Sequence, residues 1–211
     1  MMQLDRFRRL FETPLGAFDA VASIIVVLCV AAIFIAIICN FAEANTHAVR
    51  KERRSVVETG TMTLFFIIYY LVARFQIGAL HPQSVPLHIT LVSLSIAVLI
   101  LGTFVNIRGR TSLGHNWANQ IRMYDDQSIV HSGPYAFVRH PLYASLIWMF
   151  FAGSVMYVNW LLFLLTACVF VPFMTWRARQ EEGMLEETFP EYGAYRKATG
   201  MFFPKLLRSH P

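Results

Sequence analysis

The chain has 211 residues, of which 56% are hydrophobic and only 15% are charged, and its formal net charge is +5. Soluble domains carry about 25% charged residues, so this composition excludes an ordinary soluble domain and indicates that lipid is the main solvent. In a membrane protein the positive charge is typical of cytosolic loops that face anionic lipid. No basic run is interleaved with aromatic residues, so we expect membrane lipids as partners and no nucleic acid.

The three cysteines, Cys29, Cys39 and Cys168, all lie inside apolar runs. Their spacing provides neither a disulfide framework nor a set of metal ligands. Buried thiols and no metal site are therefore expected.

Five apolar runs predict membrane-spanning helices, since a span takes roughly 20 residues. They cover residues 18–41, 60–80, 86–107, 141–158 and 159–176. The first run is too long for the apolar region of a signal peptide, which has about 7–15 residues. The last two meet at Asn159 and predict a helical hairpin, residues 141–176, in which Pro172 should kink the second helix. The sequence thus predicts an all-α integral membrane protein with about five transmembrane helices and a C-terminal helical hairpin.

Lysine and arginine indicate how these helices are oriented. They gather in residues 42–59, in residues 108–140 and in the tail from Arg177, whereas the turns after the second and fourth runs hold none. By the positive-inside rule the basic segments face the cytosol. With five spans the N-terminus would lie outside, yet residues 6–9 carry three arginines. Either those arginines lie on a short interfacial helix or one of the five spans is wrong.

Polar residues collect just before the predicted hairpin, in Gly133-Pro134-Tyr135 and Arg139-His140-Pro141-Leu142-Tyr143. Gly-Pro indicates a turn, and Pro141 suits the first position of a helix, where its missing N–H costs nothing. The free N–H groups and positive dipole end of that helix would lie beside Arg139 and His140. Together they predict a site for a carboxylate or a phosphate.

A complementary cluster follows the hairpin, where Glu181 lies four residues after Arg177 on the same helix face and Glu182 comes next. These carboxylates can accept hydrogen bonds from an amine, a ribose hydroxyl or an adenine amino group. Each feature has a plainer interpretation: a topology anchor, a solvated helix start or part of an aromatic belt. Because a hairpin brings its two ends together, their joint occurrence favours one binding site for a ligand with a carboxylate at one end and an ammonium or a sugar at the other.

These motifs resemble the isoprenylcysteine carboxyl methyltransferase family and its relatives, the phospholipid N-methyltransferases. The likeness covers residues 108–204 and departs from the family pattern at Ser145, where glycine is usual. Further matching positions are Leu113-Gly114, Trp117, Leu185, Phe189, Glu191-Tyr192, Tyr195 and Pro204.

The resemblance implies that S-adenosylmethionine binds in a cytosol-facing pocket capped by the C-terminal segment. By position, the residues that would hold the cofactor or line its pocket are Tyr135, His140, Pro141, Leu142, Tyr143, Glu181 and Glu182. Arg139 and Arg177 would be the catalytic residues, which orient the carboxylate of an acceptor. A lipid-modified or lipid substrate would enter from the bilayer between the spans. We divide the chain into an N-terminal membrane region, residues 1–107, and a catalytic region, residues 108–211, and expect a monomer.

The expected reaction is methyl transfer to the carboxylate of an isoprenylcysteine or a similar lipidated acceptor. A carboxylate is already ionised at pH 7, so positioning rather than a general base would drive the reaction. Methylation of a phospholipid amine or a small thiol stays open. So does an NADPH-dependent reductase of the sterol type, although the two glutamates are poorly suited to a cofactor phosphate. A membrane scaffold without activity is the fourth alternative.

Overall fold

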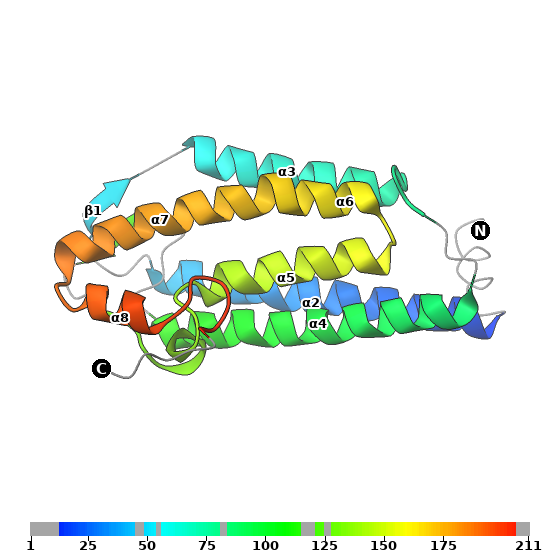
Figure 1. The fold of residues 1–211 in the computed structure, drawn as a ribbon, viewed down its shortest axis with the longest axis horizontal. Coiled ribbons are helices and arrows are strands. Elements are labelled where there is room, and N and C mark those ends of the chain that lie inside the picture. Colours follow the sequence, from blue (N-terminus) through cyan, green and yellow to red (C-terminus); the bar gives the residue numbers. More distant parts are fainter. Residues whose placement is uncertain are drawn as a thin grey trace.

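The computed structural model describes residues 13–44, 49–53, 56–80, 84–114, 121–124 and 128–205. These residues form a bundle of long helices with one small sheet (Figure 1). The elements in chain order are α2 (Pro14–Ala44), β1 (Val49–Arg53), α3 (Val56–Arg74), α4 (Val85–Leu113), β2 (Ile121–Tyr124), η2 (Gly133–Ala136), α5 (Pro141–Met156), α6 (Trp160–Leu165), η3 (Thr166–Phe170), α7 (Val171–Thr188) and α8 (Tyr192–Ala198). β1 and β2 pair antiparallel. The three N-terminal arginines and Trp117 lie outside the described residues.

Within the described residues, three helical segments are long and apolar enough to cross a membrane: Pro14–Asn40, Val85–Leu113 and Trp160–Thr188. They have 27, 29 and 29 residues, more than the roughly 20 that a bilayer requires. The prediction of a helical integral membrane protein is confirmed. Two further apolar segments, Gly60–Arg74 and Pro141–Met156, are shorter. The expected number of about five spans is therefore not confirmed.

The helices form two layers, with α3 beside α6 and α7 in one and α2, α4 and α5 in the other (Figure 1). Glycines let α4 approach α5 closely. A Cβ atom on Gly102 would lie 2.6 Å from Cγ of Met149, and one on Gly109 would lie 3.0 Å from Cδ2 of Leu142. This close packing holds the ends of α4 and α5 in register, and both ends contribute to the site below.

α5 and α6 contact each other across a short connection that Asn159 organises. Its side-chain oxygen accepts hydrogen bonds from the backbone N–H groups of Leu161 and Leu162, each at 3.0 Å, and so caps α6. Its side-chain nitrogen donates to the carbonyl of Ile77 at 3.0 Å, which ties the turn after α3 to the same point. Because α5 has only 16 residues, a transmembrane hairpin stays a prediction.

The helix from Trp160 to Thr188 is distorted just before Pro172, where η3 is a π-helical turn. Proline has no backbone N–H and its ring crowds the preceding turn, and a wider π-helical turn makes room for the ring. Arg74 ends α3 with its guanidinium 6.0 Å from the ring centroid of Phe75. It is not among the residues that line the cavity described below.

The C-terminal segment is bound to the loop that precedes α5. The N–H of Arg139 donates to the carbonyl of Gly200 at 2.8 Å, and the N–H of His140 donates to that of Met201 at 3.1 Å. A Cβ atom on Gly200 would lie 1.7 Å from the carbonyl oxygen of Phe203, so only glycine fits this turn. Residues 199–203 are thereby fixed against the loop that carries His140.

Candidate functional site

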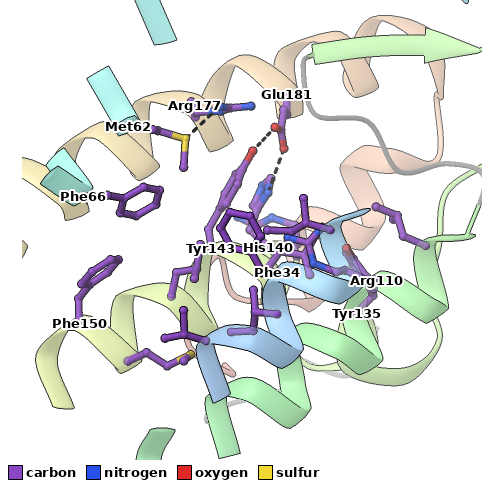
Figure 2. A pocket seen from close by; sticks show the side chains of 18 of the residues that line it. Phe34, Met62, Phe66, Arg110, Tyr135, His140, Tyr143, Phe150, Arg177 and Glu181 are labelled. Atoms are coloured by element: carbon purple, nitrogen blue, oxygen red, sulfur yellow. Dashed lines mark hydrogen bonds and ion pairs between the residues drawn. The ribbon is translucent and has the colours of Figure 1, made fainter. Parts of the chain in front are cut away.

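A cavity of about 790 Å³ lies between α2, α3, α5 and α7 (Figure 2). One end is polar and is lined by Arg110, Tyr135, His140, Tyr143, Arg177 and Glu181. The rest is largely apolar and is lined by residues that include Val30, Phe34, Phe66, Phe150, Gly153 and Met156. The lining residues on α5 run from Leu142 to Met156, a distance of about 21 Å at 1.5 Å per residue. The cavity thus joins a charged end to a long apolar extension.

His140 is the centre of the polar end. Its Nδ1 lies 3.5 Å from a carboxylate oxygen of Glu181, and its Nε2 lies 3.1 Å from one of Glu182. The Tyr143 hydroxyl donates a hydrogen bond to Glu181, and the rings of His140 and Tyr143 stack at 5.6 Å. Burial lowers the pKa of His140, but the hydrogen bonds and charges of the two glutamates outweigh burial and raise that pKa above its ordinary 6.5. Both ring nitrogens of His140 thus face a carboxylate, an arrangement that suits the imidazolium form.

Because the pKa of His140 is raised on folding, its contribution to stability is fully present below about pH 6.5 and is lost as the pH rises through the folded value. We expect the melting temperature of wild type to exceed that of His140→Gln by the largest margin at acid pH. Each kcal/mol of lost stability lowers the melting temperature by about 2–4 °C in a protein of this size.

Thermal unfolding in detergent, followed from acid pH to above the pKa of His140 in the folded protein, measures this difference in melting temperature. His131→Gln serves as the control, because His131 is exposed and contacts only the ring of Tyr195 among the interactions described. A gap between wild type and His140→Gln that stays constant with pH would contradict the proposed imidazolium.

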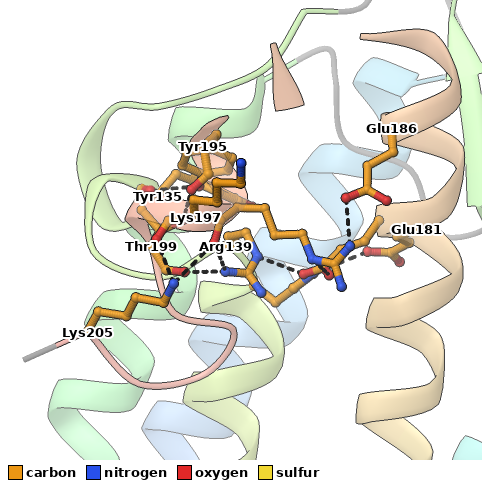
Figure 3. Close-up of polar contacts among 11 residues, drawn as sticks. Tyr135, Arg139, Glu181, Glu186, Tyr195, Lys197, Thr199 and Lys205 are labelled. Carbon is orange, nitrogen blue, oxygen red and sulfur yellow. Dashed lines mark hydrogen bonds and ion pairs between the residues drawn. The ribbon is translucent and has the colours of Figure 1, made fainter. Parts of the chain in front are cut away.

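Glu182 contacts His140 and pairs with two arginines, of which Arg139 is labelled in Figure 3. One of its oxygens is 2.7 Å from Nε of Arg139, and the other is 3.4 Å from Nε of Arg196. Arg139 also donates to the carbonyl groups of Arg196 and Thr199, so its guanidinium faces the C-terminal segment. Only 2% of the Glu182 side chain and 7% of that of Arg139 are exposed, so this is a buried ion pair.

Arg177 and Arg110 present their side chains to the cavity from two different helices (Figure 2). Nη1 of Arg177 lies 3.4 Å from the sulfur of Met62, and its guanidinium lies 5.8 Å from the ring centroid of Tyr143. Nε of Arg110 donates to the side-chain oxygen of Asn106 at 2.9 Å. The cavity thus has a cation on each side of its polar end.

The structure brings most of the residues singled out from the sequence to this end. Those that line the cavity are Tyr135, Arg139, His140, Leu142, Tyr143, Arg177 and Glu181. Pro141 and Glu182 are buried beside it and are not among its lining residues. Tyr195 closes the group from α8, where its hydroxyl donates to the carbonyl of Tyr135 at 2.7 Å.

Sequence reasoning missed Arg110, Asn106 and the contribution of α2 and α3. Arg110 was assigned to a basic loop after the third span, whereas α4 continues to Leu113 and carries it into the cavity. The available signal was the spacing of four residues between Asn106 and Arg110, which places both side chains on one helix face. The lining residues of α2 and α3 carry no local signal, because apolar residues also face lipid.

The comparison with protein families decides which proteins this site resembles. A match to the family described as isoprenylcysteine carboxyl methyltransferase extends over residues 94–187. This part, a little under half of the chain, is therefore similar to the isoprenylcysteine carboxyl methyltransferase family. No curated protein matches the chain at a significant level.

The family region begins within α4 and ends one residue before the end of α7. It contains His140, Glu181 and Glu182 together with Arg110, Arg139 and Arg177, so the resemblance is confirmed and methyltransferase chemistry is implied. It starts earlier than the likeness seen in the sequence and stops before the tail. The C-terminal positions from Phe189 to Pro204 therefore lie outside the isoprenylcysteine methyltransferase match.

Proposed function

We propose that the protein is an S-adenosylmethionine-dependent membrane methyltransferase that methylates the carboxylate of an isoprenylcysteine or a similar lipidated acceptor. The observation that carries this proposal is the shape of the cavity. Its polar end supplies cations, a carboxylate and hydroxyls. Its apolar extension, lined on α5 from Leu146 to Met156 over about 15 Å, suits a lipid chain.

The residues at the polar end fit the cofactor. S-adenosylmethionine has an amine, a carboxylate and ribose hydroxyls, which require acceptors and cations close together. Glu181 supplies acceptor oxygens, His140 and Tyr143 fix that carboxylate, and Tyr135 and Leu142 supply apolar surface. The cofactor would supply an electrophilic methyl group. Pro141 and Glu182 would act from behind the cavity, with Glu182 holding His140 in place.

An acceptor carboxylate is ionised at neutral pH, so the protein needs to orient it rather than remove a proton. Arg177 borders the cavity and would contact that carboxylate, since a guanidinium can pair with both of its oxygens. Arg139 is paired with Glu182 and with the C-terminal carbonyls. Its proposed role is therefore to position Glu182 and the C-terminal segment.

The lipid chain of the acceptor would lie in the apolar extension between α2 and α3, having entered from the bilayer. Arg177 lines the polar end and Arg196 pairs with Glu182 beside it, and by the positive-inside rule we place that end in the cytosol. The protein would act as a monomer among membrane lipids. The division between residues 107 and 108 falls inside α4 and so does not separate two structural units. We retain it as a division of function, between a membrane region and a catalytic region.

Binding of S-adenosylmethionine to detergent-purified protein, measured by calorimetry, tests this proposal. We expect Glu181→Gln to weaken binding by about 10–150-fold, because a hydrogen bond to a charged group contributes roughly 1.5–3 kcal/mol. Glu191→Gln is the matched control, since Glu191 is exposed and lies outside the cavity lining. Binding of NADPH instead would favour the reductase, and binding of neither ligand to folded protein would favour the scaffold.

A further inference from the structure

A row of buried polar side chains connects α5 to the polar end of the cavity. Ser145 and Asn106 are both completely buried, and Arg110 is 7% exposed. Nδ2 of Asn106 lies 2.8 Å from the Ser145 hydroxyl, and Oδ1 of Asn106 lies 2.9 Å from Nε of Arg110. Of these three residues only Arg110 lines the cavity. Arg110 thus lies at the site, whereas Ser145 and Asn106 lie outside the cavity.

The direction of these hydrogen bonds is fixed by the carbonyl group of Leu142. A carbonyl can only accept, and it receives the Ser145 hydroxyl at 2.9 Å and Nδ2 of Asn106 at 3.3 Å. The amide nitrogen of Asn106 must therefore face α5. Its oxygen then faces Arg110, where it accepts from Nε.

This arrangement orients the Arg110 guanidinium through a hydrogen bond at Nε. The partner at Nε is a neutral amide, in contrast to Arg139, whose Nε is paired with the carboxylate of Glu182. The side chain of Asn106 has little freedom, because Gly109 allows α4 to pack against Leu142 of α5. A planar cation held in this way is suited to pairing with a carboxylate inside the cavity.

We propose that Arg110 forms a carboxylate-binding subsite of the cavity, and that Ser145 and Asn106 are positioning residues that orient its guanidinium. This inference rests on the proposed methyltransferase function for the source of the ligand. Two carboxylates could occupy the subsite: that of the acceptor, or that of the methionine part of S-adenosylmethionine. Ser145 stands where glycine is usual in the family, so its hydroxyl supplies an anchor for Asn106 that glycine would lack.

Two pairs of ligands test which of these two carboxylates occupies the subsite. Binding of S-adenosylmethionine is compared with that of its decarboxylated analogue, which tests the cofactor carboxylate. Binding of N-acetyl-S-farnesylcysteine is compared with that of its carboxamide, which tests the acceptor carboxylate. Both are measured by calorimetry on wild type, Arg110→Gln, Arg110→Lys, Asn106→Leu and Ser145→Ala, with intrinsic fluorescence and gel filtration to verify folding.

For one of the two pairs, we expect wild type to bind the ligand that carries the carboxylate about 10–100-fold more tightly than the analogue that lacks it. Arg110→Gln should abolish that preference. Arg110→Lys should restore part of it. Ser145→Ala and Asn106→Leu should each reduce the preference for the carboxylate about 3–10-fold. If the carboxylate is that of the acceptor, a methyl-transfer assay of these variants should show a rise in the acceptor KM that exceeds the fall in kcat.

Ser154→Ala is the matched control for Ser145→Ala. Ser154 is also a buried serine on α5, and it donates to the carbonyl three residues earlier at 2.7 Å, but it has no place in the row. The proposal is overturned if folded Arg110→Gln keeps both preferences, or if Ser145→Ala changes them no more than Ser154→Ala does. Absence of cofactor binding in wild type would defeat the proposed function instead, and the acceptor pair would still test the subsite.

Discussion

Replacing Glu182 by alanine is expected to destabilise the folded protein by about 3–5 kcal/mol, the typical cost of removing one partner of a buried ion pair. The side chains of Glu182 and Arg139 are 2% and 7% exposed, and their closest atoms are 2.7 Å apart. Without the carboxylate, the guanidinium of Arg139 would stay buried beside His140 with neither an anion nor bulk water to solvate it. Chemical denaturation in detergent micelles measures the loss.

Glu186→Ala is the control for this prediction. Glu186 lies one helical turn further along α7, is 39% exposed and pairs with the half-exposed Arg196 at 2.6 Å. An exposed pair of this kind contributes roughly 0.2–1 kcal/mol, so its loss should be small. Equal destabilisation by the two variants would show that Glu182 is not the anchor of the C-terminal segment.

Gly153→Leu is expected to reduce methylation of a farnesyl acceptor by about tenfold or more, with little effect on a geranyl acceptor or on cofactor binding. Gly153 lines the cavity about 16 Å beyond Leu142 along α5, at 1.5 Å per residue. A Cβ atom there would lie 2.6 Å from the hydroxyl of Tyr69, which donates to the carbonyl of Phe150 at 2.8 Å. A leucine would therefore fill the apolar extension or push Tyr69 into it.

The size of this effect follows from the lipid chain that no longer fits. Each buried methylene group contributes about 0.8 kcal/mol, so displacing two of them costs more than tenfold in kcat/KM. Val155→Leu is the matched control, because Val155 lies on the same helix, is 38% exposed and does not line the cavity. Parallel losses for farnesyl and geranyl acceptors would mean that the chain does not reach Gly153.

The length and apolarity of its segments determined that this protein is a helical membrane protein. A helix from Pro14 or Val85 needs no distant partner, because its backbone groups are satisfied within the segment and its side chains are solvated by lipid. The proline and glycine signals around residues 133–141 similarly placed the loop before α5. Where a segment was short, as at Pro141–Met156, length alone could not decide whether it spans the bilayer.

The residue types at the site could also be predicted, because His140 and Glu181 belong to short motifs at two ends of neighbouring helices. The contacts that each of the site residues makes could not be predicted. Only the tertiary structure turned Arg139 toward Glu182 and the C-terminal carbonyls, and only the length of α4 carried Arg110 into the cavity. The reason is that a local pattern fixes the backbone of a segment, whereas the partners of a buried charge such as Arg139 lie 43 to 60 residues away and are brought within hydrogen-bond distance by packing.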